Sequence, residues 1–189
     1  MAELIGGLVI FLGMHSVAIV APAARDHARS RWGEGPWKIG YALISLVGLI
    51  LTVRGFGLTR LAPVMLYTPP TWLRHVAFLL MLPVFPLLFA ANLPGRIRTA
   101  TKHPMLAAVK FWALAHLLAN GRLADVLLFG GFLVWAVVDR ISLKHRSQSL
   151  RMAPPGRFND LLAVVLGLAT YVFFIAWAHV RLFGVSPLG

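Results

Sequence analysis

The chain has 189 residues, 59% of them hydrophobic, a mean hydropathy of +0.78 and a formal net charge of +12. This composition excludes an ordinary soluble globular protein and predicts an integral membrane protein, whose partner is the lipid bilayer. A charge of this size would suit nucleic-acid binding, but the cations lie in short loops between apolar segments, so we predict no nucleic-acid partner. The absence of cysteine excludes disulfides and thiolate metal sites.

Six apolar segments approach the length that a helix needs to cross a hydrocarbon core. They predict an all-α, polytopic membrane helix bundle that forms a single domain over residues 1–189. The expected helices cover residues 4–24, 38–56, 72–93, 104–120, 122–140 and 159–182. Twelve of the 18 lysines and arginines fall in the first, third and fifth loops between them. The positive-inside rule therefore places these loops in the cytoplasm and both termini outside.

The first helix carries one polar side chain of consequence, His15. Counting from Leu4 puts it roughly 16 Å down, near the middle of a core about 30 Å thick. A histidine at that depth needs a partner. Two alternatives remain equal at this point, an interhelical hydrogen bond and a metal or haem ligand.

The next two helices predict packing features rather than chemistry. The loop after the first helix contains Trp32, which we interpret as an interface residue. Gly40 and Gly48 in the second helix would permit close contact with a neighbouring helix. Pro83 and Pro86 should kink the third helix, because each lacks a backbone donor.

The fourth helix is expected to begin at Pro104 and holds several polar residues among apolar ones. Helical rotation separates these polar side chains into two stripes. The first stripe holds His103 and Lys110, and the second holds Trp112, His116 and Asn120. His116 lies about 18 Å from Pro104, again near the middle of the membrane.

The similar depth of His15 and His116 makes them candidate axial ligands of a haem iron between helices one and four. No CxxCH motif occurs, so a covalently attached c-type haem is excluded. Lys110 or His103 would then lie near a propionate or a polar substrate. In the turn that follows, Asp125 is expected to pair with Arg122 or to reach Asn120.

Five motifs together resemble the NnrU family of bacterial inner-membrane proteins. They are FLGMHS, WGEGPWKIGYALISL, KHPMLAAVKFWALAHLLANG, DVLLFGGFLVWAVVDR and the closing GVSPL. The resemblance implies a multi-pass protein of the bacterial inner (cytoplasmic) membrane. It also implies an accessory role in nitrite and nitric oxide reduction, or denitrification, with components of the nitric oxide reductase system as candidate partners.

A related enzyme, zeta-carotene isomerase, carries the same domain and uses a b-type haem with two histidine ligands. Its histidines correspond to His15 and His116, so the resemblance selects the same pair. That enzyme has a cysteine three residues before the second histidine, proposed to exchange with it as a ligand. Ala113 stands at this position here, which disfavours a ligand switch.

The resemblance leaves three further functions to compare with an accessory haem protein. One is haem-dependent cis–trans isomerisation of an apolar polyene substrate, and another is a haemless transporter or assembly factor. The third is methyl transfer, because His103-Pro104 resembles a motif of isoprenylcysteine methyltransferases. The Glu-Glu pair and the FGxxY element of that family are absent from this chain, so methyl transfer is disfavoured.

Overall fold

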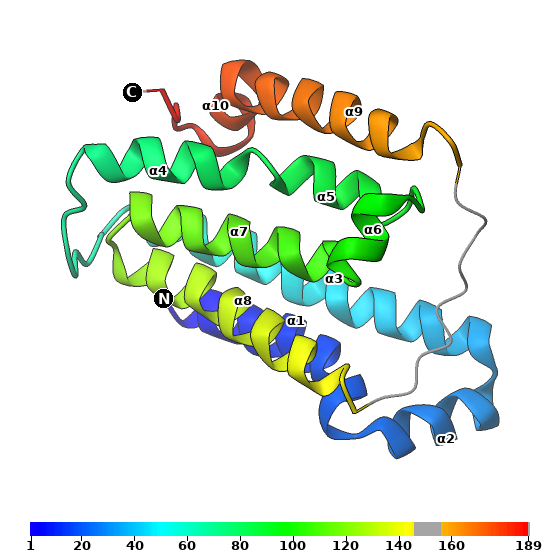
Figure 1. Cartoon of the computed structure of the whole chain (residues 1–189). Helices are drawn as coiled ribbons and strands as arrows, with labels where there is room; N and C mark the ends of the chain where they lie inside the picture. Colours follow the sequence, from blue (N-terminus) through cyan, green and yellow to red (C-terminus); the bar gives the residue numbers. More distant parts are fainter. Residues whose placement is uncertain (146–155, 189) are drawn as a thin grey trace. The chain divides into compact units, whose positions relative to one another are not determined.

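The computed structural model describes residues 1–145 and 156–188, and the secondary structure of this part is helical apart from one isolated bridge. The predicted all-α class is therefore confirmed. Figure 1 shows the helices in chain order. They are α1 (Ala2–Val20), α2 (Pro22–Trp32), α3 (Glu34–Leu58), α4 (Trp72–Met81), α5 (Val84–Ala90), α6 (Arg96–Thr101), α7 (Pro104–Ala119), α8 (Leu123–Ser142), α9 (Asn159–Phe173), the π-helical turn η1 (Phe174–Ala178) and α10 (His179–Phe183).

Four helical stretches in the described part are long and apolar enough to cross a membrane. They are Ala2–Val20, Glu34–Leu58, Trp72–Ala90 and Asn159–Phe183. Helix α7 is also apolar but shorter. Helix α8 has 20 residues, and three of them are charged: Asp125, Asp139 and Arg140.

The first loop expected from the sequence is wrong, because the chain forms helix α2 there. Alanine and arginine favour helix, and Pro22 occupies a position in the first turn where its missing N–H costs nothing. Gly33 ends α2 with a φ of 89°, a conformation that other residues rarely adopt. Helix α1 ends at Val20 rather than near residue 24, because α2 begins at Pro22. Helix α2 has no buried residue.

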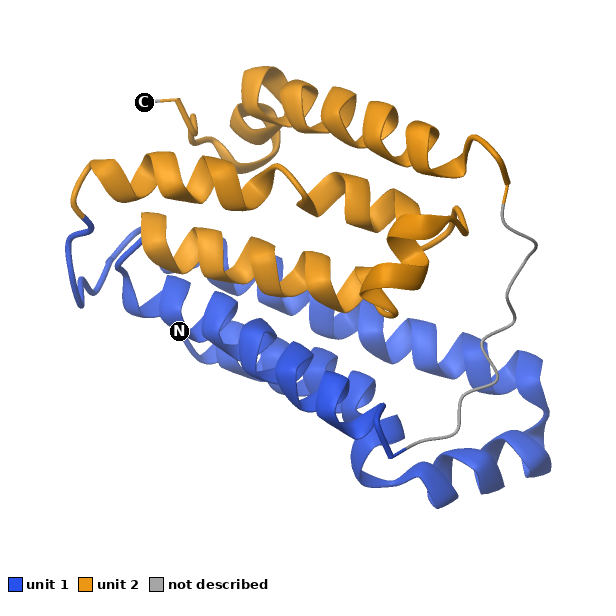
Figure 2. Cartoon of the chain, viewed as in Figure 1, with its two compact units in different colours: residues 1–69, 120–146 blue, residues 70–119, 147–189 orange. Residues whose placement is uncertain are grey.

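The helices group into two compact units, shown in Figure 2. Unit 1 comprises the described part of residues 1–69 and 120–146. In it α1 packs closely on α3, since a Cβ on Gly48 would lie 2.7 Å from the Phe11 backbone nitrogen. The contact predicted at Gly48 is confirmed, whereas a Cβ on Gly40 would meet nothing within 4 Å. Helix α8 completes the core of unit 1, where Ala124 lies against Leu4 and Leu8.

Backbone hydrogen bonds attach the loop after α3 to the turn before α8, at one end of unit 1. The N–H groups of Leu66 and Tyr67 donate to the Gly121 carbonyl at 2.8 and 3.2 Å, and the Leu123 N–H donates to Val64 at 2.8 Å. The Tyr67 hydroxyl donates to the Asn120 carbonyl at 2.7 Å. Partial burial, and then the negative charge of Asp125, raise the pKa of Tyr67, so the hydroxyl keeps the proton that it donates.

The expected pairing of Asp125 with Arg122 is confirmed. Nη2 and Nε of Arg122 lie 2.7 and 2.8 Å from the carboxylate oxygens, and the Arg122 backbone N–H donates to the same carboxylate at 3.1 Å. Asp125 is fully buried, at 0% exposure. It therefore caps the start of α8 and neutralises the arginine at the same time.

Unit 2 comprises residues 70–119 and the described part of residues 147–189. Its core contains Val84 and Leu87 of α5 and Ala108 of α7. The predicted kink corresponds to a break at Pro83, because α4 ends at Met81 and α5 begins at Val84, whereas Pro86 lies within α5. Across from this break, the Tyr171 hydroxyl of α9 donates to the Phe78 carbonyl at 2.9 Å.

Asp160 joins the first turn of α9 to the start of α6. Its carboxylate accepts the backbone N–H groups of Arg96 and Ile97 at 2.9 and 3.0 Å. We expect Asp160→Ala to lower the melting temperature of the detergent-solubilised protein by a few degrees, because two backbone donors lose a charged acceptor. Circular dichroism measures the shift. Asp160→Asn keeps one acceptor oxygen and should fall between the two, whereas an unchanged melting temperature in Asp160→Ala would contradict the assignment.

Candidate functional site

The position of His15 along its helix differs from the expected one. Because α1 runs from Ala2 to Val20, His15 lies about 20 Å from the first residue and about 8 Å from the last. The expected end of this helix at residue 24 is wrong, whereas the expected depth of His15 near the middle of the membrane stays a prediction. His116 in α7 lies about 18 Å from Pro104, as expected, and about 5 Å from Ala119. The similar depth of the two histidines in the membrane likewise stays a prediction.

The hydrogen bond of His15 defines its tautomer. Nδ1 lies 2.7 Å from the carbonyl oxygen of Phe11, one turn earlier in the same helix. A carbonyl oxygen can only accept, so Nδ1 carries the hydrogen and Nε2 carries the lone pair of a neutral ring. This hydrogen bond lies within α1, so Nδ1 does not make the interhelical bond that was one of the two alternatives.

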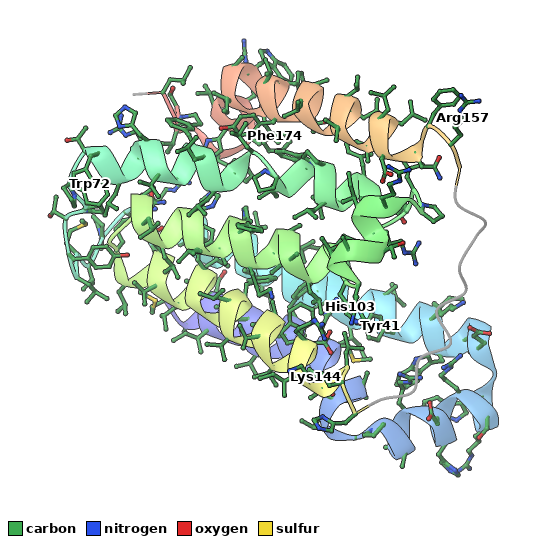
Figure 3. The ribbon with its side chains drawn as sticks, in the orientation of Figure 1. Tyr41, Trp72, His103, Lys144, Arg157 and Phe174 are labelled. Atoms are coloured by element: carbon green, nitrogen blue, oxygen red, sulfur yellow. The ribbon has the colours of Figure 1, made fainter. Side chains whose placement is uncertain are left out.

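Aromatic rings from three helices of unit 1 surround the His15 imidazole. Phe11 of α1 stacks on it with ring centroids 4.2 Å apart. Tyr41 of α3, labelled in Figure 3, and Trp135 of α8 approach it edge-on at 5.3 and 5.9 Å. These contacts restrict the rotation of a half-buried imidazole, which is a requirement for a precise ligand.

His116 in unit 2 has the same local arrangement. Its Nδ1 lies 2.8 Å from the carbonyl oxygen of Trp112, one turn earlier in α7. The Trp112 ring also contacts the imidazole, with ring centroids 5.3 Å apart. As in His15, the hydrogen is on Nδ1 and the lone pair of a neutral ring is on Nε2. Ala113, which follows Trp112, is completely buried.

A family model described as NnrU protein matches residues 3–187 of the chain. The chain belongs to the NnrU family. No curated protein and no solved structure matches it. The resemblance inferred from the motifs is thus confirmed.

The other candidate residues of the NnrU chain divide between the units. His103, labelled in Figure 3, directly precedes α7, and Lys110 is half-buried within α7, so both belong to unit 2 together with Trp112 and His116. Asn120 belongs to unit 1, where its carbonyl accepts the Tyr67 hydroxyl. This bond gives Asn120 a structural contact in the turn before α8.

Tyr41 and Trp135 are two residues beside His15 that the sequence did not single out. Their importance arises from the packing of α3 and α8 against α1, which residue spacing within one helix does not reveal. A signal was available for Trp135, because tryptophans in membrane proteins concentrate at the interfaces and this one lies inside a long apolar run.

Proposed function

We propose that this NnrU protein is a multi-pass protein of the bacterial inner membrane that binds haem b, with His15 and His116 as the axial ligands. The observation that supports this most is the shared hydrogen bond of the two imidazoles to a carbonyl of their own helix. Iron binds a neutral imidazole through the nitrogen that carries the lone pair. A hydrogen bond from the other ring nitrogen to a backbone carbonyl orients such ligands in many metal sites.

The surroundings of both histidines also suit a porphyrin. Each ring lies on an apolar helix and contacts aromatic side chains: Phe11, Tyr41 and Trp135 beside His15, and Trp112 beside His116. Flat cofactors bind where such side chains predominate and a few polar groups fix their orientation. The two ligands belong to different units, and the likeness of both histidines to the haem ligands of zeta-carotene isomerase is what supports pairing them.

A haem iron with two histidine ligands supplies one-electron transfer when bound. From the family membership we propose an accessory role in nitrite and nitric oxide reduction, with components of the nitric oxide reductase system as partners. Within the protein, the Nδ1 hydrogen bonds to Phe11 and Trp112 would hold both rings in a fixed orientation.

We also propose that α7 and α8 cross the membrane, which gives six spans and places both termini in the periplasm. The charges of α8 support this, because Asp125 lies in its first turn, paired with Arg122, and Arg140 lies in its last. The residues from Val126 to Val138 carry no charge. Cationic loops at alternate ends of the helices support the orientation.

The purified protein, expressed with ample haem, is expected to show the Soret band and the sharp visible bands of a low-spin haem. His15→Ala and His116→Ala should each lose most of the bound haem, because each substitution removes an axial ligand. The ratio of haem to protein, measured by pyridine haemochrome, quantifies the loss. His27→Ala and His75→Ala change exposed histidines and should retain the wild-type ratio.

Two results would contradict the proposal. Wild-type protein without a Soret band would exclude haem binding. An unchanged haem content in either ligand variant would remove that histidine from the ligand set, and a change in only one of them would indicate a single-histidine site.

A further inference from the structure

The indole N–H of Trp135 is a buried hydrogen-bond donor without an acceptor among the described residues. An indole nitrogen can only donate, and a buried tryptophan N–H usually finds an acceptor. Leaving such a donor unpaired costs free energy, so the Trp135 N–H requires an acceptor that the described residues do not provide.

The unpaired N–H belongs to a side chain in contact with the candidate ligand histidine. Trp135 lies perpendicular to the His15 ring, with centroids 5.9 Å apart. The Nδ1 of His15 is already bonded to the Phe11 carbonyl. A molecule bound beside His15 and in contact with Trp135 would need an acceptor oxygen to satisfy the indole N–H.

The chemistry of haem restricts what that acceptor is. Away from the iron and the four nitrogens that bind it, haem b has hydrogen-bond acceptors only at its two propionate carboxylates. A carboxylate is a strong acceptor, and a bond from N–H to a charged oxygen is stronger than one to a neutral oxygen.

The location of Trp135 also suits a carboxylate. His15, Tyr41 and Trp135 lie about 8, 10 and 10 Å from the ends of α1, α3 and α8 that adjoin the cationic loops. Cations outnumber carboxylates among the described residues of these loops and helix ends. The cations are Arg25, Arg29, Arg31, Lys38, Arg140 and Lys144, and the carboxylates are Asp26, Glu34 and Asp139. Positive charge at this end of unit 1 favours an ionised propionate.

We propose that the indole N–H of Trp135 donates a hydrogen bond to a haem propionate. The inference rests on the proposed function, because it requires haem at His15. It assigns a cofactor-binding role to a residue of α8, and it explains why a tryptophan rather than a phenylalanine lies beside His15.

Haem and its dimethyl ester, in which both carboxylates are neutral esters, are the probes for this inference. Each is titrated into protein expressed under haem depletion, for the wild type and for Trp135→Phe, which keeps an aromatic ring without the N–H. We expect Trp135→Phe to weaken haem binding about tenfold and to change binding of the diester much less. Trp177→Phe, at a tryptophan that is 53% exposed, is the matched control and should change neither.

The outcomes separate the two proposals. If the wild type binds neither porphyrin, the proposed function fails. If the wild type binds haem and Trp135→Phe leaves the ratio of the two affinities unchanged, this inference alone fails. Where Trp135→Phe does not fold, benzothienylalanine at position 135 keeps the shape of the indole without its N–H, and the same change in the ratio is expected.

Discussion

Asp125→Ala is expected to lower the free energy of unfolding by about 3–5 kcal/mol, because removing one partner of a buried ion pair leaves the other uncompensated. The side chains of Asp125 and Arg122 are 1% and 25% exposed, and they lie 2.7 Å apart. The substitution also removes the acceptor for the backbone N–H of Arg122 at the start of α8. Unfolding by SDS in mixed micelles, followed by circular dichroism, measures the change.

Asp125→Asn serves as the control for charge. Its amide oxygen still accepts one N–H but carries no charge, so the loss should be smaller than in Asp125→Ala. The double variant Arg122→Ala with Asp125→Ala should be less unstable than the sum of the single variants. A change below about 1 kcal/mol in Asp125→Ala would show that the pair contributes little.

Gly121→Ala is expected to destabilise unit 1 by about 3 kcal/mol, at the upper end of the usual cost of overpacking. The new Cβ would overlap the backbone carbonyl of Tyr67. Neither segment can move away easily, because the N–H groups of Leu66 and Tyr67 donate to the Gly121 carbonyl. The same SDS titration reports the stability, and proteolysis of the loop before α4 reports local opening.

Gly130→Ala in α8 is a matched control for Gly121→Ala. A Cβ at Gly130 would meet nothing within 4 Å. Alanine also favours helix over glycine, so this variant should be as stable as the wild type or slightly more stable. Equal stability of the two alanine variants would show that the contact at Tyr67 relaxes without cost.

Hydropathy predicted the helical class and the membrane location, because apolar length is a property of the sequence alone. It was less successful at the ends of helices. Ala21, with a φ of −138° and a ψ of 56°, interrupts the helix before Pro22, so the first helix ends at Val20 and α2 occupies most of the expected loop. The error moved His15 from the middle of its helix toward one end. A proline following an apolar run was the signal for this boundary.

The features of the candidate site were likewise only partly predictable from the sequence. The pairing of Asp125 with Arg122 could be predicted, because residues three apart lie on one face of a helix turn. His15 and His116 were chosen because polar groups are rare in apolar helices. Their bonds to Phe11 and Trp112 depend on side-chain rotamers, which the sequence does not specify. Trp135 was missed because it meets His15 only through the packing of α8 on α1.

Each of the two units combines segments that are far apart in the sequence, and this constrains the order in which they can assemble during translation. The contact of Leu4 with Ala124 belongs to unit 1, yet α4 to α7, which belong to unit 2, are synthesised before Ala124. Unit 2 in turn needs α9, the last long helix. During translation α1 and α3 must therefore wait in the membrane, with lipid or a chaperone covering the face that α8 will occupy. Truncation anywhere before α8 is expected to leave both units incomplete, so neither can be obtained as a continuous fragment.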